Sequence, residues 1–145
     1  MYKATEDDIP KVWEIFKKHK EWFPHVRLFH VRTRVGREQV ILEDGVVITY
    51  HKNQNNRKIG QNTDVKVEKG SHMIHQILNE NVGNGNSEKV IKKFFDFVGS
   101  DVYLTVRADN VPANKFYNKI GMKEVGEICW SQGKMLGKVW KYSTE

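Results

Sequence analysis

The chain has 145 residues, of which 39% are hydrophobic and 29% are charged, as in an ordinary soluble globular protein. Its one cysteine excludes an internal disulfide, and no apolar run approaches the ~20 residues that a membrane span needs. The net charge of +6 comes from basic residues spread along the chain, which fits a solvated surface or an anionic ligand better than a nucleic-acid-binding tail. We therefore expect one cytoplasmic domain over residues 1–145, with no membrane partner.

The first predicted elements are a short strand and an amphipathic helix. Residues 2–5 can form the strand, and residues 5–20 have the spacing of a helix. The apolar face of this helix carries Ile9, Val12, Trp13 and Phe16. Residues 21–30 are expected to form a loop or a short second helix, interrupted at Pro24.

A β-hairpin is predicted next, over residues 38–52. Two runs rich in β-formers flank Asp44-Gly45, a strong turn dipeptide. Residues 53–62 are polar and rich in Gly and Asn, so they are expected to form a loop.

The second half of the chain alternates strands and helices. The expected elements are one or two strands over 63–79, a loop over 80–87, a helix over 87–99, a strand over 101–108, a helix over 110–122 and a closing hairpin over 122–143 with its turn at 131–134. Ser87 is the expected cap of the first of these helices. This mixture of hairpins and helical crossovers predicts an α/β or α+β layered domain.

The loop before the helix at 87–99 has the features of an anion site. Gly83 and Gly85 allow a positive φ and a close approach of the backbone to a ligand. N–H groups at the start of a helix carry partial positive charge and can bind a phosphate. The same stretch can also be a plain glycine-rich helix entry. No Gly-Lys-Ser/Thr follows, so it is not a P-loop.

The order strand, glycine-rich turn, helix, strand, followed by a helix of the form N-x-x-A-x-x-F-Y-x-K-x-G-[FM], resembles the GNAT acetyltransferase superfamily. The matching residues are Asn110, Ala113, Phe116, Tyr117, Lys119, Gly121 and Met122. The resemblance covers residues 72–142, and the N-terminal half only by element order. It implies a central, mostly antiparallel sheet of six to seven strands flanked by helices, and acetyl-CoA as cofactor.

The resemblance also implies where the cofactor binds. The family's loop reads [QR]-x-x-G-x-[GA], and the corresponding residues here are Val82, Gly83, Asn84, Gly85, Asn86 and Ser87. Val82 replaces the usual Arg or Gln, so Lys89, Lys92 or Lys93 could supply the missing charge. Further implied contacts come from Leu78, Asn110, Ala113 and Phe116.

Tyr117 occupies the family's general-acid position. Its implied role is to donate a proton or a hydrogen bond to the departing CoA thiolate. The sequence pattern also predicts that the Tyr117 side chain points towards the sheet. One helical face, which should pack on the sheet, carries Ala113, Phe116, Tyr117 and Ile120. The alternative is a purely structural tyrosine.

Several residues could take the proton from the acceptor amine, since the family has no fixed base. His75 is the preferred candidate because an ordinary histidine pKa near 6.5 suits the task, and His72, Glu80 or a water remain open. His72 and His75 are three apart on a strand, so they should face opposite ways and not chelate a metal.

The acceptor is expected to be a small-molecule or peptide amine. Trp22, Phe23, His25 and Arg27 lie where the family places an acceptor-gating segment, although a packed helical corner is the alternative. Their aromatic and basic mixture makes a nucleic-acid acceptor or partner a second hypothesis. A non-catalytic acyl-CoA-binding module is a third, suggested by Val82. The chain is expected to be a monomer or a homodimer.

Overall fold

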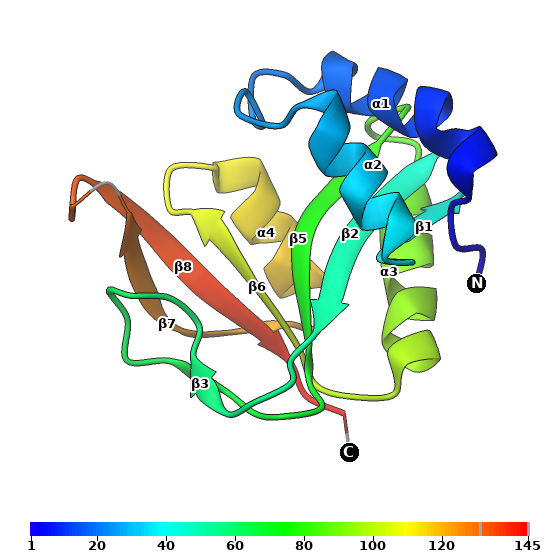
Figure 1. Ribbon diagram of the computed structural model, residues 1–145. Helices are drawn as coiled ribbons and strands as arrows, with labels where there is room; N and C mark the ends of the chain where they lie inside the picture. The colour runs from blue at the N-terminus through cyan, green and yellow to red at the C-terminus, as the bar shows by residue number, and fades with distance from the viewer. Residues whose placement is uncertain (131, 145) are drawn as a thin grey trace. The chain divides into compact units, whose positions relative to one another are not determined.

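The computed structural model describes residues 1–130 and 132–144 and contains a six-stranded, mostly antiparallel sheet in the order β1-β2-β5-β6-β8-β7 (Figure 1). The predicted α/β fold class is therefore confirmed. The backbone divides into two compact units, the first formed by residues 1–50 and 75–97 and the second by residues 51–74 and 98–145. Each unit is described in turn.

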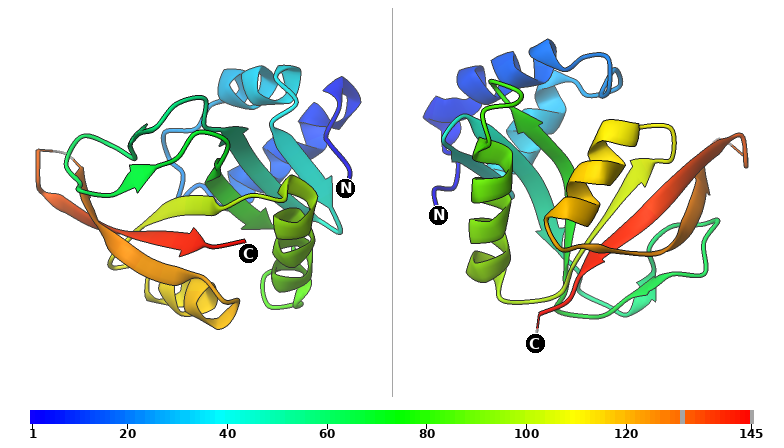
Figure 2. Two further views of the ribbon diagram at one scale, coloured as in Figure 1. Left: turned by 90° about the horizontal axis from the view of Figure 1, so that it is seen from below. Right: turned by 180° about the vertical axis from the view of Figure 1, so that it is seen from behind.

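The first unit contains the β1–β2 hairpin, the end of β5 and three α-helices. Its elements are η1 (Glu6–Asp8), α1 (Ile9–Lys18), α2 (Leu28–Gly36), β1 (Val40–Glu43), β2 (Val46–Lys52), β5 (His72–Asn79) and α3 (Asn86–Val98). In this unit, α1 and α2 lie over one face of the strands and α3 over the other (Figures 1 and 2).

Because both faces of this part of the sheet are covered, the sequence of β2 is almost continuously apolar. Val47 and Leu78 pack in the core under α1 and α2, together with Val12, Ile15 and Phe16 of α1. Tyr50, on the other face, meets Phe94 of α3 edge to face with ring centroids 5.0 Å apart. The predicted hairpin is confirmed, with Asp44 and Gly45 both at positive φ (50° and 76°) in its turn.

One prediction for the first unit is wrong, and the two N-terminal helices differ from the prediction in their bounds. Residues 2–5 form no strand, since only Lys3 makes an isolated bridge, to Ile41. The helix predicted over 5–20 is confirmed, as the short helix η1 followed directly by α1 from Ile9. A short second helix was one of the two alternatives for residues 21–30, but α2 begins only at Leu28 and ends at Gly36. Its bounds were missed because only Val31 and Val35 are buried along it and its basic residues mask the periodicity.

The second unit contains the small strands β3 (Arg57–Lys58) and β4 (Lys66–Val67), the strand β6 (Val102–Arg107), the helix α4 (Val111–Lys119) and the strands β7 (Lys123–Trp130) and β8 (Met135–Tyr142). β6 runs parallel to the start of β5, and β7 pairs with β8 as the predicted closing hairpin. Ser131, in the predicted turn of that hairpin, lies outside the described residues. Val67, Tyr103, Ile128 and Val139 form the core on one face, and α4 packs on Trp140 on the other.

Candidate active site

The loop between β5 and α3 exposes a row of backbone N–H groups. Gly83 and Gly85 take positive φ values of 90° and 82°, and no atom lies within 4 Å of a Cβ built on either. Among residues 1–130 and 132–144, the N–H groups of Gly83, Gly85 and Ser87 have no hydrogen-bond acceptor. We call residues 82–87 the cradle. Its open space and its donors fit the pyrophosphate of a CoA molecule.

The cradle is held by side-chain amides. Asn79, which is 8% exposed, donates from Nδ2 to Oδ1 of Asn84 at 2.9 Å and to Oγ of Ser87 at 3.0 Å. Asn84 Oδ1 also accepts from the backbone N–H of Asn86 at 3.0 Å. Ser87 lies inside the first turn of α3, so its predicted role as the cap of that helix is wrong. Its hydroxyl instead ties the helix to the end of β5.

The lysines that could replace the charge missing at Val82 are already paired. Lys89 lies 3.5 Å from Asp44, Lys92 lies 3.0 Å from Glu88 and Lys93 lies 3.2 Å from Glu43. Val82 itself is strongly exposed. The backbone of the cradle therefore carries the main capacity for binding an anion. The side chain of Leu78 is buried in the core and is not available to a cofactor.

Tyr117 lies in the second unit, on the sheet-facing side of α4. Its ring centroid is 6.3 Å from that of Trp140 on β8 and 5.7 Å from that of Phe116. No described residue hydrogen-bonds to its hydroxyl. Burial raises the pKa of Tyr117 to about 12, so the phenol is neutral at physiological pH.

The start of α4 is fixed as the sequence predicted. Asn110 caps the helix, with its Oδ1 accepting from the N–H of Ala113 at 3.3 Å. Asn114, which the sequence reading missed, donates to the carbonyl oxygen of Arg107 at 3.1 Å and accepts from Trp140 Nε1 at 2.9 Å. These bonds hold α4, and with it Tyr117, against the ends of β6 and β8.

The candidate bases differ in their surroundings. Glu80 forms an ion pair with Lys11 of α1, and this hydrogen bond lowers the pKa of its carboxyl, which makes Glu80 a weak base. His72 hydrogen-bonds to Ser100 through Nδ1 at 2.6 Å, and burial lowers its pKa, with Lys52 and His51 adding to the effect. His75 is half-buried on β5. Since side chains alternate along a strand, it faces away from Gln76.

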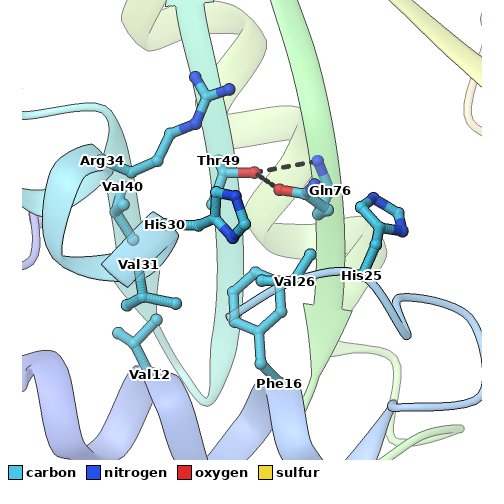
Figure 3. A pocket seen from close by; sticks show the side chains of 10 residues that line it. All are labelled: Val12, Phe16, His25, Val26, His30, Val31, Arg34, Val40, Thr49 and Gln76. Atoms are coloured by element: carbon cyan, nitrogen blue, oxygen red, sulfur yellow. Dashed lines mark hydrogen bonds between the residues drawn. The ribbon is translucent and has the colours of Figure 1, made fainter. Parts of the chain in front are cut away.

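A cavity of about 200 Å³ lies in the first unit, between the two N-terminal helices and the sheet (Figure 3). Its lining residues are Val12, Phe16, His25, Val26, His30, Val31, Arg34, Val40, Thr49 and Gln76. Of the four residues predicted to bind the acceptor, His25 lines this cavity. Trp22 and Arg27 are exposed outside the lining, and Phe23 packs on Phe16 with ring centroids 6.1 Å apart.

No protein-family model matches the sequence, and no curated protein is significantly similar to it. Solved structures match in fold. A GNAT-family acetyltransferase from Streptococcus agalactiae 2603 gives a TM-score of 0.77 at 12% identity, covering 99% of this chain and 94% of its own. The chain has the GNAT acetyltransferase fold.

Two further proteins share the GNAT fold with this chain. The NatC complex bound to Gag peptide and CoA matches with a TM-score of 0.69 at 9% identity, over 97% of this chain and 93% of the other. The ribosomal-protein-S18-alanine N-acetyltransferase from Escherichia coli matches with a TM-score of 0.65 at 13% identity, over 99% and 92%. At identities of 9–13%, these structural matches establish the fold alone.

Other kinds of site find no support within the described ranges. No group of three or more His, Cys, Asp or Glu side chains in residues 1–130 and 132–144 is placed to hold a metal ion. None of the helices in these ranges is long and apolar enough to cross a membrane.

Proposed function

We propose that the chain is an acetyl-CoA-dependent N-acetyltransferase that acts on an amine of a small molecule or a peptide. The observation that carries this proposal is the cradle, which presents at the start of α3 the N–H groups of Gly83, Gly85 and Ser87, none of which has an acceptor among the described residues. A helix start with a glycine-rich entry and free donors is suited to a pyrophosphate. The GNAT fold of the chain adds support, since one structure with that fold contains CoA.

Acetyl-CoA would supply an activated acetyl group, and transfer replaces its C–S bond with a C–N bond to the amine. The reaction releases the CoA thiol and one proton from the amine. The residues of this chain have three tasks, which are to hold the phosphates, to stabilise the departing sulfur and to accept the amine's proton.

Tyr117 takes the second task. With a pKa of about 12, its phenol is a weaker acid than a thiol, whose ordinary pKa is ~8.5. Full proton transfer to sulfur is therefore unfavourable, and the hydroxyl stabilises the developing charge as a hydrogen-bond donor. Asn110, Ala113 and Phe116 keep their proposed role as cofactor contacts on α4.

The third task falls to a histidine or to water. His75 on β5 is one candidate, and His25 is a second because it lines the cavity. The ion pair with Lys11 makes Glu80 the weakest of the three.

The test is an assay of thiol release from acetyl-CoA with panels of amines, peptides and nucleic acids, with mass spectrometry of the products. The proposal predicts an acetylated amine with at least one member of the amine or peptide panels. Modification in the nucleic-acid panel alone would favour the second hypothesis. Binding of acetyl-CoA with no thiol release in any panel would assign a non-catalytic acyl-CoA-binding module instead.

A further inference from the structure

The cavity between the N-terminal helices and the sheet has an apolar floor and a polar rim (Figure 3). The floor is formed by Val12, Phe16, Val26, Val31 and Val40. At about 200 Å³ the cavity holds roughly six or seven waters at ~30 Å³ each, which is less than the ~300–1,000 Å³ of a typical ligand pocket. Its occupant must be small and partly apolar.

Arg34 gives the rim a positive charge that no carboxylate of the described residues neutralises. The guanidinium is half-buried and donates from Nη1 to Gln39 Oε1 at 3.2 Å, a neutral partner. Among residues 1–130 and 132–144, no Asp or Glu forms an ion pair with it. Burial lowers the pKa of Arg34, and repulsion from Arg37 adds to this effect. A charge in this position gains from an anionic partner.

His30 adds a hydrogen-bond donor to the rim. Its Nδ1 accepts from the backbone N–H of Arg27 at 2.9 Å. A neutral imidazole that accepts at Nδ1 carries its proton on Nε2. His30 therefore offers an N–H at its other nitrogen.

Gln76 adds a second donor. Its Oε1 accepts from the hydroxyl of Thr49, whose oxygen in turn accepts from the Gln76 backbone N–H at 3.0 Å. The side-chain NH₂ of Gln76 has no acceptor among the residues that the structure describes. The rim thus presents N–H donors, and none of the ten lining residues is an acid.

From this arrangement we infer that the cavity binds the acceptor, and that the acceptor is a small primary amine whose apolar body ends in a carboxylate. The carboxylate lies at Arg34, with His30 and Gln76 as further donors, and the apolar body lies on the valine and phenylalanine floor. Figure 3 shows Arg34 and His25 on opposite sides of the view, so the amine end extends away from Arg34 towards the His25 side. This inference rests on the proposed function.

The direct experiment compares two amines that differ only in the carboxylate, 5-aminopentanoate and pentylamine, by kcat/KM for acetyl transfer. A hydrogen bond to a charged group is worth ~1.5–3 kcal/mol, so we expect 5-aminopentanoate to be preferred by about 10- to 100-fold. Arg34→Met keeps the apolar stem and should remove this preference by lowering kcat/KM for 5-aminopentanoate about 10- to 100-fold. Arg32→Met is the matched control, because Arg32 is exposed on the same helix and does not line the cavity.

A binding measurement separates failure of this inference from failure of the proposed function. Calorimetric titration of the protein alone with pentanoate and with 1-pentanol needs no acetyl transfer. Pentanoate binding that Arg34→Met abolishes upholds the carboxylate site even if no amine is acetylated. Equal rates with the two amines, or equal binding of pentanoate and pentanol, overturn it. If Arg34→Met does not fold, the same test uses the unaltered chain and Arg34→Lys. Pentanoate should then bind more tightly than 1-pentanol to the unaltered chain, and equal binding of the two overturns the carboxylate site.

Discussion

Asn79, at the end of β5, donates a hydrogen bond of 3.0 Å to the hydroxyl of Ser87 in the first turn of α3. The same amide group donates to Asn84 in the middle of the intervening loop. One buried side chain thereby fixes the centre of the cradle and its last residue. The cradle is preorganised, so a bound phosphate would not have to order it.

Replacing Asn79 should weaken both the fold and the binding of CoA. Asn79→Ala removes both bonds, and also the one that Asn79 Oδ1 accepts from the Asn81 N–H at 2.9 Å, and should lower the free energy of unfolding by about 1–3 kcal/mol. CoA affinity should fall with it, because the loop N–H groups lose their alignment. Urea unfolding and calorimetric titration measure the two effects. Asn56→Ala, on an exposed loop of the second unit, is the control. If the two variants bind CoA with the same affinity, Asn79 does not hold the cradle for CoA binding.

Tyr117→Phe tests the role of the hydroxyl on α4. The ring and its packing on Trp140 remain, so the melting temperature should change little. Turnover should fall by about 10²–10⁴-fold with unchanged CoA affinity, because the bond to sulfur forms only as charge develops. Tyr103→Phe should show the reverse pattern, since it removes the half-buried hydrogen bond of 2.6 Å that the hydroxyl of Tyr103 donates to Glu68. Near-normal turnover of Tyr117→Phe would make Tyr117 a packing residue.

The proton acceptor can be assigned from pH–rate profiles of three variants. Glu80→Gln should keep turnover within about threefold, because the Glu80 carboxylate is paired with Lys11 and its pKa is lowered, which makes it a poor base. The acidic limb of kcat/KM should vanish in His75→Ala or in His25→Ala, and the variant that loses it identifies the base. If the limb survives in all three variants, a water takes the proton.

The stability of the protein should fall as the pH is lowered through the titration of His72. Burial lowers the pKa of this histidine in the folded state, so the unfolded chain binds more protons between the two pKa values. The stabilisation is fully present above the ordinary pKa of ~6.5 and is lost as the pH falls through the lower folded value. His72→Asn, which retains a hydrogen-bonding group for Ser100, should flatten this dependence below about pH 6.5 in urea unfolding. An unchanged slope would show that another group titrates.

Local signals in the sequence were enough to predict much of this fold. Asp44-Gly45 fixed the first hairpin because both residues adopt the positive φ that a tight hairpin turn needs. Asn110 was predicted as a cap, and it caps α4. The turn and the helix cap depend only on residues within a few positions along the chain, so a local sequence pattern is enough to predict them.

The features that were missed depend on tertiary contacts. The role of Asn79 is visible only once the loop folds back on the end of β5. The cavity combines Arg34 of α2, Thr49 of β2 and Gln76 of β5, three elements whose proximity no local pattern reveals. The only sequence signal for these two features was weak. It was the presence of polar residues in otherwise apolar strands.

The most direct test of the account is the dissociation constant of CoA for the unaltered chain, Gly85→Ala and Gly70→Ala. Both glycines have positive φ (82° and 91°) with no atom within 4 Å of an added Cβ, so both substitutions should cost about 1–2 kcal/mol of stability. Only Gly85 lies in the cradle. The account predicts that Gly85→Ala weakens CoA binding by about tenfold or more, since the methyl group occupies the space that the pyrophosphate needs, while Gly70→Ala binds CoA like the unaltered chain. Equal dissociation constants for the three proteins, or no CoA binding by the unaltered chain, would contradict it.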